Sequence, residues 1–329
     1  MKNKIKAKLK WLYCTLIYKL RKHLLPKHYR FEYEFYEKIR SRSYSDTSYM
    51  ELKLRAITHA LDKTLVFKKI NEKKAICSLI REMTKQVKND PGHDAATVGW
   101  SQMVLDEYEK RSNGTSGLSE NFESLDIATS ELLKDILTSR RSIRSFKANP
   151  ISKELVYQIL NAGLWAPTGC NRQTMEYLLL EDKEDIRFCQ KMAGEGYAFP
   201  AQAPLTVVIL IDPRGYALPV QRHMAFLEGG AATQNILLMA HSLGIGSCWL
   251  FWDNSTVNYS KFMKRFSLNP WLLPVAMICL GYPDKIPNFR PERKNLTKCI
   301  HFSKSGLQRT SNDTAKLARR NLDDIACHC

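Results

Sequence analysis

The residues best suited to chemistry lie in the second half of the chain. The segment Ser139-Arg-Arg-Ser-Ile-Arg-Ser-Phe146 places three arginines and three serines within seven positions. Guanidinium groups bind phosphate through paired hydrogen bonds, and a nearby hydroxyl group can add another. A solvated charge run would have the same composition, so the segment alone leaves both interpretations open.

Three further segments carry polar and small residues in patterns that suit a flat, phosphorylated ligand. Each also has a plain structural alternative: a loop, a helix packed through small residues, or a solvated basic surface run. A nicotinamide-binding Rossmann unit is not indicated, because these segments contain no GxGxxG pattern. The segments are Ala166–Gln173, Gly229–Asn235 running into Leu243–Leu250, and Gly281–Pro283 followed by Arg290–Lys294.

Taken in chain order, the four segments resemble the nitroreductase family of FMN proteins over about residues 131–303. Arg140–Phe146 is similar to the family's basic residue followed by Ser-x-Arg-x-Phe, and Ala166–Gln173 is similar to its Ala-Pro-Ser/Thr-x-x-Asn-x-Gln loop. Ala231–Trp249 resembles its Ala-x-Gln-Asn helix and Leu-Gly-x-Gly-Ser-Cys-Trp stretch. Gly281–Arg293 resembles its Gly-Tyr-Pro and basic-Pro-x-Arg ending. Any one of these motifs is unspecific, but four in the same order are strong evidence.

The resemblance implies a homodimer with FMN at the subunit interface. One group of residues would hold the flavin phosphate and the pyrimidine edge, a second would approach the flavin from the other subunit, and a third would lie near flavin N5. Arg290 or Arg293 would complete the phosphate site, and Arg293 fits the family's spacing better. The group for the phosphate and the pyrimidine edge is Arg140, Arg141, Ser142 and Arg144. The group from the other subunit is Pro167, Thr168, Gly169, Asn171 and Gln173. The group near N5 is the backbone of Leu250, Phe251 and Trp252.

The resemblance also implies the chemistry. NADH or NADPH would give hydride to flavin N5, and electrons would then pass to a small organic acceptor in the same site, which is a ping-pong scheme. The reaction is centred on the flavin, so we expect no catalytic side chain and no metal. Two features depart from the family pattern: Thr174-Met175 replaces Pro-Trp, and Phe251-Trp252 is unusually bulky. The acceptor therefore stays unassigned, and a specialised flavin reaction, such as dehydrogenation of a peptide-derived ring or reductive dehalogenation, stays open.

Hydrophobic periodicity predicts the elements that position these segments. The predicted fold class is α+β, preceded by a basic, mostly helical region, and the resemblance implies a central, mostly antiparallel sheet flanked by helices. We expect a helical region over 1–110, a linker over 111–130, the FMN domain over 131–303 and a tail over 304–329. The expected helices are Tyr49–Ile70, Lys73–Val87, Leu125–Thr138, Ser152–Leu164 and Phe226–Leu243, and the expected strands are Glu176–Leu180, Leu205–Ile211 and Pro274–Leu280.

The net charge of +17 is concentrated at the start of the chain, where residues 1–30 hold ten lysines and arginines and no acidic residue. Residues 3–25 read as one amphipathic helix, which is typical of a helix lying on an anionic membrane surface. Packing on the protein itself or on a partner is the alternative, and no nucleic-acid-binding motif accompanies the charge. The hypothesis that competes with an enzyme is therefore a membrane-surface or scaffold protein with a vestigial flavin domain.

The nine cysteines form no CxxC pair and are odd in number, which favours reduced thiols in a cytoplasmic protein. Cys327-His-Cys329 lacks a complete metal ligand set. No run reaches the roughly 20 apolar residues of a membrane span. We therefore expect a cytoplasmic protein that could lie at the periphery of the inner face of a membrane.

Overall fold

The computed structural model describes residues 35, 45–65, 73–114, 126–192, 199–216, 221, 223–252, 256–286 and 292–301. The chain divides into two units, residues 1–286 and 287–329, which are treated separately. The predicted basic helix within 1–30, Arg290, the tail over 304–329 and Cys327-His-Cys329 lie outside the described residues. The predicted domain boundaries stay predictions.

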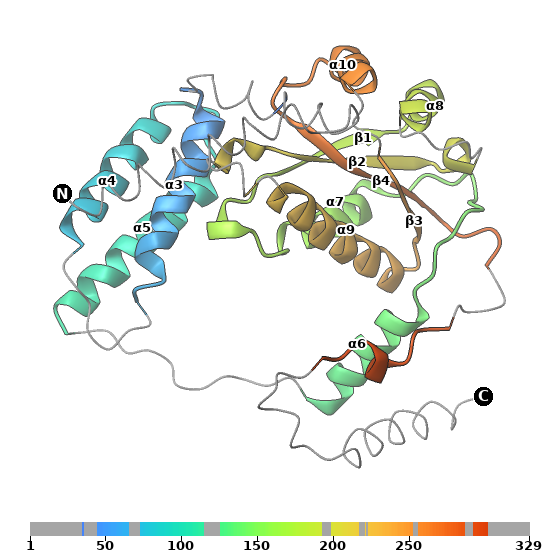
Figure 1. The fold of residues 1–329 in the computed structure, drawn as a ribbon, viewed down its shortest axis with the longest axis horizontal. Coiled ribbons are helices and arrows are strands. Elements are labelled where there is room, and N and C mark those ends of the chain that lie inside the picture. Colours follow the sequence, from blue (N-terminus) through green and yellow to red (C-terminus); the bar gives the residue numbers. More distant parts are fainter. Residues whose placement is uncertain are drawn as a thin grey trace. The chain divides into compact units, whose positions relative to one another are not determined.

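A four-stranded antiparallel sheet organises the first unit, in the order β1-β2-β4-β3 (Figure 1). The strands are β1 (Met175–Leu180), β2 (Leu205–Ile211), β3 (Gly246–Leu250) and β4 (Leu273–Gly281). Every residue of β2 is buried, because successive side chains enter cores on opposite faces of the sheet. Val208 and Leu210 belong to one core, and Val207 and Ile209 belong to the other.

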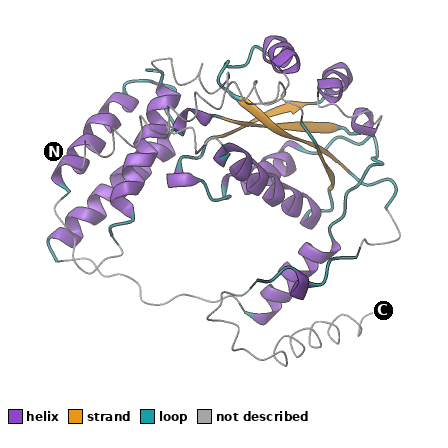
Figure 2. Ribbon diagram, in the orientation of Figure 1, coloured by secondary structure: helices purple, strands orange, loops and turns teal. Residues whose placement is uncertain are grey.

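Helices cover both faces of this sheet, so the predicted α+β class is confirmed (Figures 1 and 2). α7 (Lys153–Leu164) and α9 (Met224–Ser242) lie on one face, and α8 (Lys183–Met192) and α10 (Thr256–Arg265) lie on the other. The serine predicted to begin α7 does so, since the Ser152 side chain accepts a hydrogen bond from Leu155 N–H. α6 (Ile127–Ser139) precedes the arginine-rich segment.

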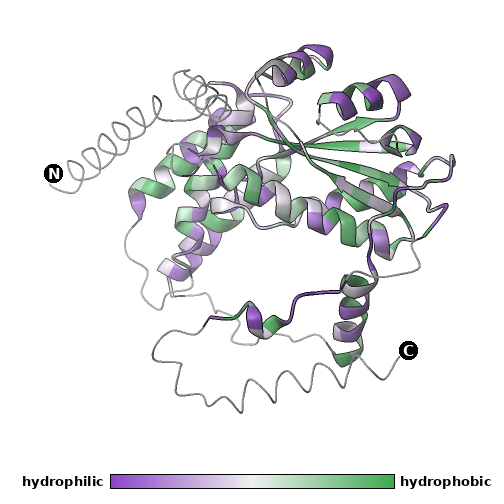
Figure 3. Ribbon diagram, turned by 45° about the vertical axis from the view of Figure 1, so that its right-hand side comes forward, coloured by the Kyte–Doolittle hydropathy of each residue, from purple (hydrophilic) through white to green (hydrophobic). Residues whose placement is uncertain are grey.

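Three helices before residue 114 pack around a core of their own: α3 (Thr47–Asp62), α4 (Lys74–Lys88) and α5 (Ala95–Ser112). Hydrophobic and hydrophilic residues alternate along these helices, and the core between them is apolar (Figure 3). Asp46 and Asp94 cap the N-termini of α3 and α5 by accepting backbone N–H bonds. Short 3₁₀ turns complete the described elements: η2 (Gly169–Asn171), η3 (Phe199–Gln202), η4 (Pro213–Gly215) and, in the second unit, η6 (Leu296–Lys298).

Two predictions about these elements were wrong. The helix expected from Tyr49 to Ile70 ends at Asp62, where the Thr64 hydroxyl donates to the carbonyl of Leu61 at 2.6 Å and the chain turns. Residues 246–250, which are not among the expected strands, form β3. The glycine needed for the turn is Gly244, with φ +72°, and the strand begins two residues later.

Gly229 lets α9 lie directly on β4, and the adjacent Gly230 provides a matched control. A Cβ at position 229 would come within 2.4 Å of Val275 Cγ2, whereas at position 230 the nearest atom would be 3.7 Å away. We expect Gly229→Ala to lower the free energy of unfolding by about 1–3 kcal/mol through overpacking. Gly230→Ala should be neutral or stabilising by up to about 1 kcal/mol, because alanine favours helix. Urea denaturation of both variants tests this, and equal stabilities would contradict the close contact of α9 with β4.

Candidate functional site

The arginine-rich segment runs as an extended chain along the edge of β3. Ile143 N–H donates to the carbonyl of Ser247 at 2.9 Å, and Ser142 pairs with Ser247 in a parallel bridge. Ile143 and Phe146 are buried and anchor the segment, while Arg144 is exposed and Arg141 is half-buried. The Ser139 hydroxyl and His241 Nε2 lie 2.7 Å apart, which ties the start of the segment to the end of α9. The first motif is therefore fixed beside the third.

The fourth motif meets the first within the same unit. Phe146 pairs with Pro283, and Lys147 N–H donates to the carbonyl of Tyr282 at 2.9 Å. The Ser145 hydroxyl donates to the Asp284 carboxylate at 2.9 Å. Arg293 belongs to the second unit, so its predicted place in a shared phosphate site stays a prediction.

The segment from residue 168 to residue 174, which joins α7 to β1, has an unusual backbone. Cys170, Asn171 and Gln173 adopt positive φ angles of 58°, 51° and 53°. Such angles in residues other than glycine cost about 1–3 kcal/mol each unless the surroundings enforce them, and they cluster at functional sites. Side chains of the segment support the conformation, since Thr168 Oγ1 accepts from Gln173 N–H at 3.0 Å and Gln173 Nε2 donates to Asn171 Oδ1 at 2.9 Å.

Glu228 on α9 holds this segment from inside the protein, and the sequence analysis did not identify it. The side chain is 2% exposed and accepts hydrogen bonds from Gly169 N–H at 2.6 Å, from the Thr174 hydroxyl at 2.9 Å and from the Tyr216 hydroxyl. Its position on the helix was a usable signal, because Ala225, Gly229 and Ala232 lie on the same buried face. An acidic side chain on such a buried face needs hydrogen-bond donors around it, because a buried carboxylate without them is unfavourable.

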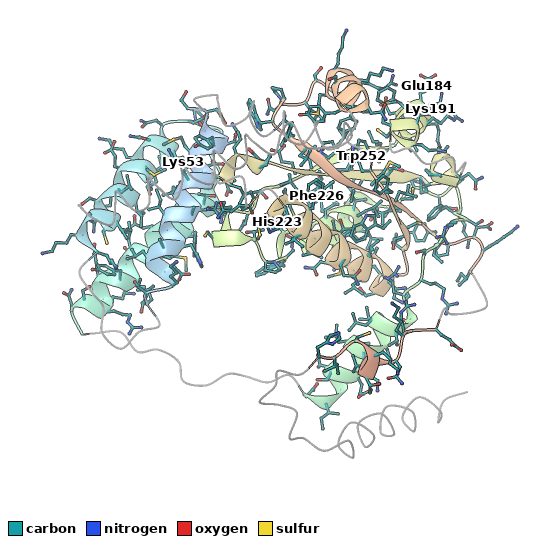
Figure 4. The ribbon with its side chains drawn as sticks, viewed as in Figure 1. Lys53, Glu184, Lys191, His223, Phe226 and Trp252 are labelled. Carbon is teal, nitrogen blue, oxygen red and sulfur yellow. The ribbon has the colours of Figure 1, made fainter. Side chains whose placement is uncertain are left out.

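The end of β3 places two large rings in solvent. Trp249 is 44% exposed and Phe251 is 67% exposed, whereas Leu250 and Trp252 are buried. The Trp252 ring packs edge-on against Phe262 of α10, with 4.9 Å between the ring centroids (Figure 4). Because the Trp252 side chain is buried, only its backbone is available to a ligand. Of the two bulky residues Phe251 and Trp252, Phe251 is the one whose side chain is exposed at the end of β3.

A buried ion-pair network joins α3 to the sheet, and sequence reasoning also missed it. The Arg214 side chain is fully buried and donates to Asp212 at 2.5–2.9 Å, to Asp46 at 2.6 Å and to the Ser48 hydroxyl at 2.8 Å. Its guanidinium group also lies 4.0 Å from the ring centroid of Trp271.

The network lowers the pKa of Asp46. Burial opposes ionisation of Asp46, but hydrogen bonds from Ser48 and Arg214 outweigh it and hold the pKa of Asp46 below its usual value. The stabilisation from Asp46 is therefore complete above its usual pKa and is lost as the pH falls through the lowered value.

A polar cavity of about 230 Å³ lies between α3 and the first residues of β1. Arg55 pairs with Asp94 across it at 3.1 Å, and the Glu51 carboxylate accepts Asp94 N–H at 2.6 Å. Burial raises the pKa of Glu51. The other wall includes Arg172, Gln173, Glu176 and Asp212. The cavity therefore adjoins the residue 168–174 segment through Arg172 and Gln173.

Among the described residues, no group of three histidine, cysteine or acidic side chains is arranged to hold a metal ion. None of the described helices is long and apolar enough to cross a membrane. The described chemistry therefore rests on hydrogen-bond donors and cations. The first motif contacts α9 through His241, near the end of the helix, and pairs with β3. The 168–174 segment contacts α9 through Glu228, near the start of the helix, so a single chain does not bring these two groups together.

Comparisons with known proteins find relatives of the second half of this chain. A family model described as the nitroreductase family matches residues 137–198 and 190–282. A protein of Archaeoglobus fulgidus named "Putative NADH dehydrogenase/NAD(P)H nitroreductase" is 31% identical over 159 residues, covering 48% of this chain and 89% of that protein. An FMN reductase [NAD(P)H] of Bacillus subtilis is 26% identical over 168 residues, covering 46% of this chain and 66% of that protein. The solved structure of an FMN-dependent nitroreductase from Clostridium difficile is 27% identical, covering 52% of this chain and 99% of that one, with a TM-score of 0.45.

Proposed function

The chain belongs to the nitroreductase family, and from that premise we propose that it binds FMN and carries electrons from NADH or NADPH to a small organic acceptor. The family assignment makes it a flavin oxidoreductase; the cofactor, the reductant and the residues that bind them are the proposal. The observation that carries it is the arrangement of the motifs, since the arginine-rich segment lies along β3 and meets Gly281–Pro283. The B. subtilis relative, named as an FMN reductase, supports the same cofactor.

The donors on this segment fit a phosphorylated flavin. Arg140, Arg141, Ser142 and Arg144 supply three cations and a hydroxyl group, with Ile143 fixing their register on β3. The geometry suits phosphate, because guanidinium groups form paired hydrogen bonds to its oxygens. Arg290 and Arg293 stay candidates for the same phosphate.

Two other groups would face the ring. Pro167, Thr168, Gly169, Asn171 and Gln173 would meet its polar edge, and the backbone at Leu250–Trp252 would lie near N5. Bound FMN would supply the redox chemistry, accepting a hydride from the nicotinamide and returning electrons to the second substrate. The protein's own task is to orient the ring and balance charge, so no side chain is assigned as a general base.

The electron acceptor is assigned no further than a small organic molecule. Thr174 and Met175, which depart from the family pattern, are both buried, and Thr174 is bonded to Glu228. They therefore point inward in the single chain. Phe251 is the departure that could restrict the substrate side, because its ring is exposed at the end of β3.

We also propose that the protein is a homodimer. None of the residues of α6 is buried, and four large apolar side chains on it are at least half exposed. They are Ile127, Leu132, Leu133 and Leu137. A monomer rarely leaves such a helix uncovered. Sedimentation velocity should give a dimer, and a Leu132→Glu, Leu133→Glu variant should shift it to monomer; a monomeric native chain would contradict this proposal.

The proposed activity is tested by steady-state kinetics. With FMN present, the chain should oxidise NADH or NADPH in the presence of a soluble quinone or nitroaromatic probe, and double-reciprocal plots should be parallel. Rates no higher than those of free FMN with either nicotinamide and both probes would argue against the proposed reaction.

A further inference from the structure

Glu228 binds three donors that come from three separate places around the 168–174 segment. One carboxylate oxygen accepts from Gly169 N–H at 2.6 Å and from the Tyr216 hydroxyl, and the other accepts from the Thr174 hydroxyl at 2.9 Å. Gly169 and Thr174 lie at the two ends of the strained stretch. A single side chain on α9 therefore fixes both ends of the segment.

We propose that Glu228 is a positioning residue that sets the backbone conformation in which residues 168–174 would meet FMN. The inference rests on the proposed function for its link to FMN. The carboxylate lies behind the segment and is 2% exposed, while Gln173 is exposed and Asn171 is half-buried. The side chains assigned to the cofactor thus lie on the outer side, and Glu228 acts through the backbone that carries them.

A carboxylate suits this junction better than an amide. Ionised Asp or Glu side chains accept on both oxygens, whereas glutamine would keep the contact with the Thr174 hydroxyl only by reversing that hydrogen bond, and it would lose the charge that strengthens the bonds from Gly169 and Tyr216. A buried carboxylate is unfavourable without such bonds. The neighbouring buried positions on α9 are Ala225, Gly229 and Ala232, so packing alone does not require an acid at this point.

Arg172 makes a second contact that holds the segment, on the side that faces Tyr216. The Arg172 guanidinium lies 5.1 Å from the Tyr216 ring centroid and donates to the carbonyl of Gly169 at 2.7 Å. Gly169 therefore donates to Glu228 through its N–H and accepts from Arg172 through its carbonyl. Gly169 is held through the two peptide groups on either side of it, which helps Cys170, Asn171 and Gln173 to keep positive φ angles.

The experiment compares full-length wild type with Glu228→Gln, Thr174→Val and Glu184→Gln. Glu184→Gln is the control, because this exposed residue lies on α8, on the other face of the sheet from α9 (Figure 4). Amide hydrogen exchange is first measured without FMN on the peptide that covers residues 168–174. Exchange should be about tenfold faster in Glu228→Gln, because the bonds to this side chain would no longer be charge-assisted, and faster by a smaller factor in Thr174→Val. The control should match wild type.

FMN affinity is then measured by quenching of flavin fluorescence. The dissociation constant should rise about tenfold in Glu228→Gln, and the visible circular dichroism of bound FMN should change, while Glu184→Gln keeps the wild-type values. Unchanged exchange in both segment variants would overturn the positioning role. Faster exchange with unchanged FMN affinity and dichroism would overturn its link to the cofactor. If wild type itself binds no FMN, the proposed function fails, and the exchange result still decides whether Glu228 holds the segment.

Discussion

Replacing Arg214 by methionine is expected to lower the free energy of unfolding by about 3–5 kcal/mol, the cost of breaking a buried ion pair by removing one partner. Arg214 is fully buried, and its loss would leave the Asp212 carboxylate without its cation in a site that is 5% exposed. Asp46 and Ser48 at the start of α3 would lose the same partner. Denaturation in urea, followed by circular dichroism, measures the change.

Two comparisons separate this effect from a general loss of charge. Arg265→Met removes an ion pair with Asp185 whose partners are 39% and 31% exposed, so it should cost no more than about 1 kcal/mol. An Asp212→Leu, Arg214→Met double variant should recover part of the lost stability, because no unpaired buried charge remains. If Arg214→Met costs no more than Arg265→Met, the network does not contribute as described.

Replacing Arg140 and Arg144 together by alanine is expected to weaken FMN binding by at least about 100-fold. Hydrogen bonds to charged groups contribute about 1.5–3 kcal/mol each, and every 1.4 kcal/mol is tenfold in affinity. Both residues lie on the segment that Ile143 anchors to β3, so the change removes donors without removing the anchor. Equilibrium titration of FMN fluorescence gives the two dissociation constants.

Lys147→Ala is the matched control for this pair. Lys147 is exposed in the same stretch, and its backbone N–H to Tyr282 survives the substitution. It should leave FMN affinity nearly unchanged, apart from a small, salt-dependent loss of general attraction. Equal losses of FMN affinity in Lys147→Ala and in the double variant would mean that the flavin is retained by net charge and not by a specific phosphate site.

Local patterns made most of the fold predictable. The run of β-branched and apolar residues Leu205–Ile211 predicts a strand buried on both faces, and β2 has these bounds. Ser152 predicts the start of α7 because a serine side chain satisfies a free N–H there. β3 was missed because it is short and begins at a glycine, Gly246, only two residues after Gly244, the glycine that makes the turn.

The candidate site was predictable only where a motif carries its own donors. Arg140–Phe146 carries the cations and hydroxyl groups that could bind phosphate, although only its order among the other motifs favours that interpretation. Asp212 is two residues from Arg214, but the other partners of Arg214 and Glu228 lie 12 to 168 residues away in the chain. Thr174 shows the same limit, because it faces Glu228 inside the protein, where sequence reasoning expected it to shape the substrate side. Which polar residues bond inside the protein and which can contact a ligand depends on residues that are distant in the sequence, so local patterns do not predict it.

Whether this chain is the FMN-dependent oxidoreductase that we propose is decided by its visible absorption spectrum. The spectrum is recorded on the full chain, freed from unbound FMN by gel filtration, before and after anaerobic addition of NADH or NADPH. We expect a flavin band that elutes with the protein and bleaches with at least one nicotinamide. A protein that elutes without a flavin band after incubation with excess FMN, or whose bound band is unchanged by both nicotinamides, would contradict the proposal.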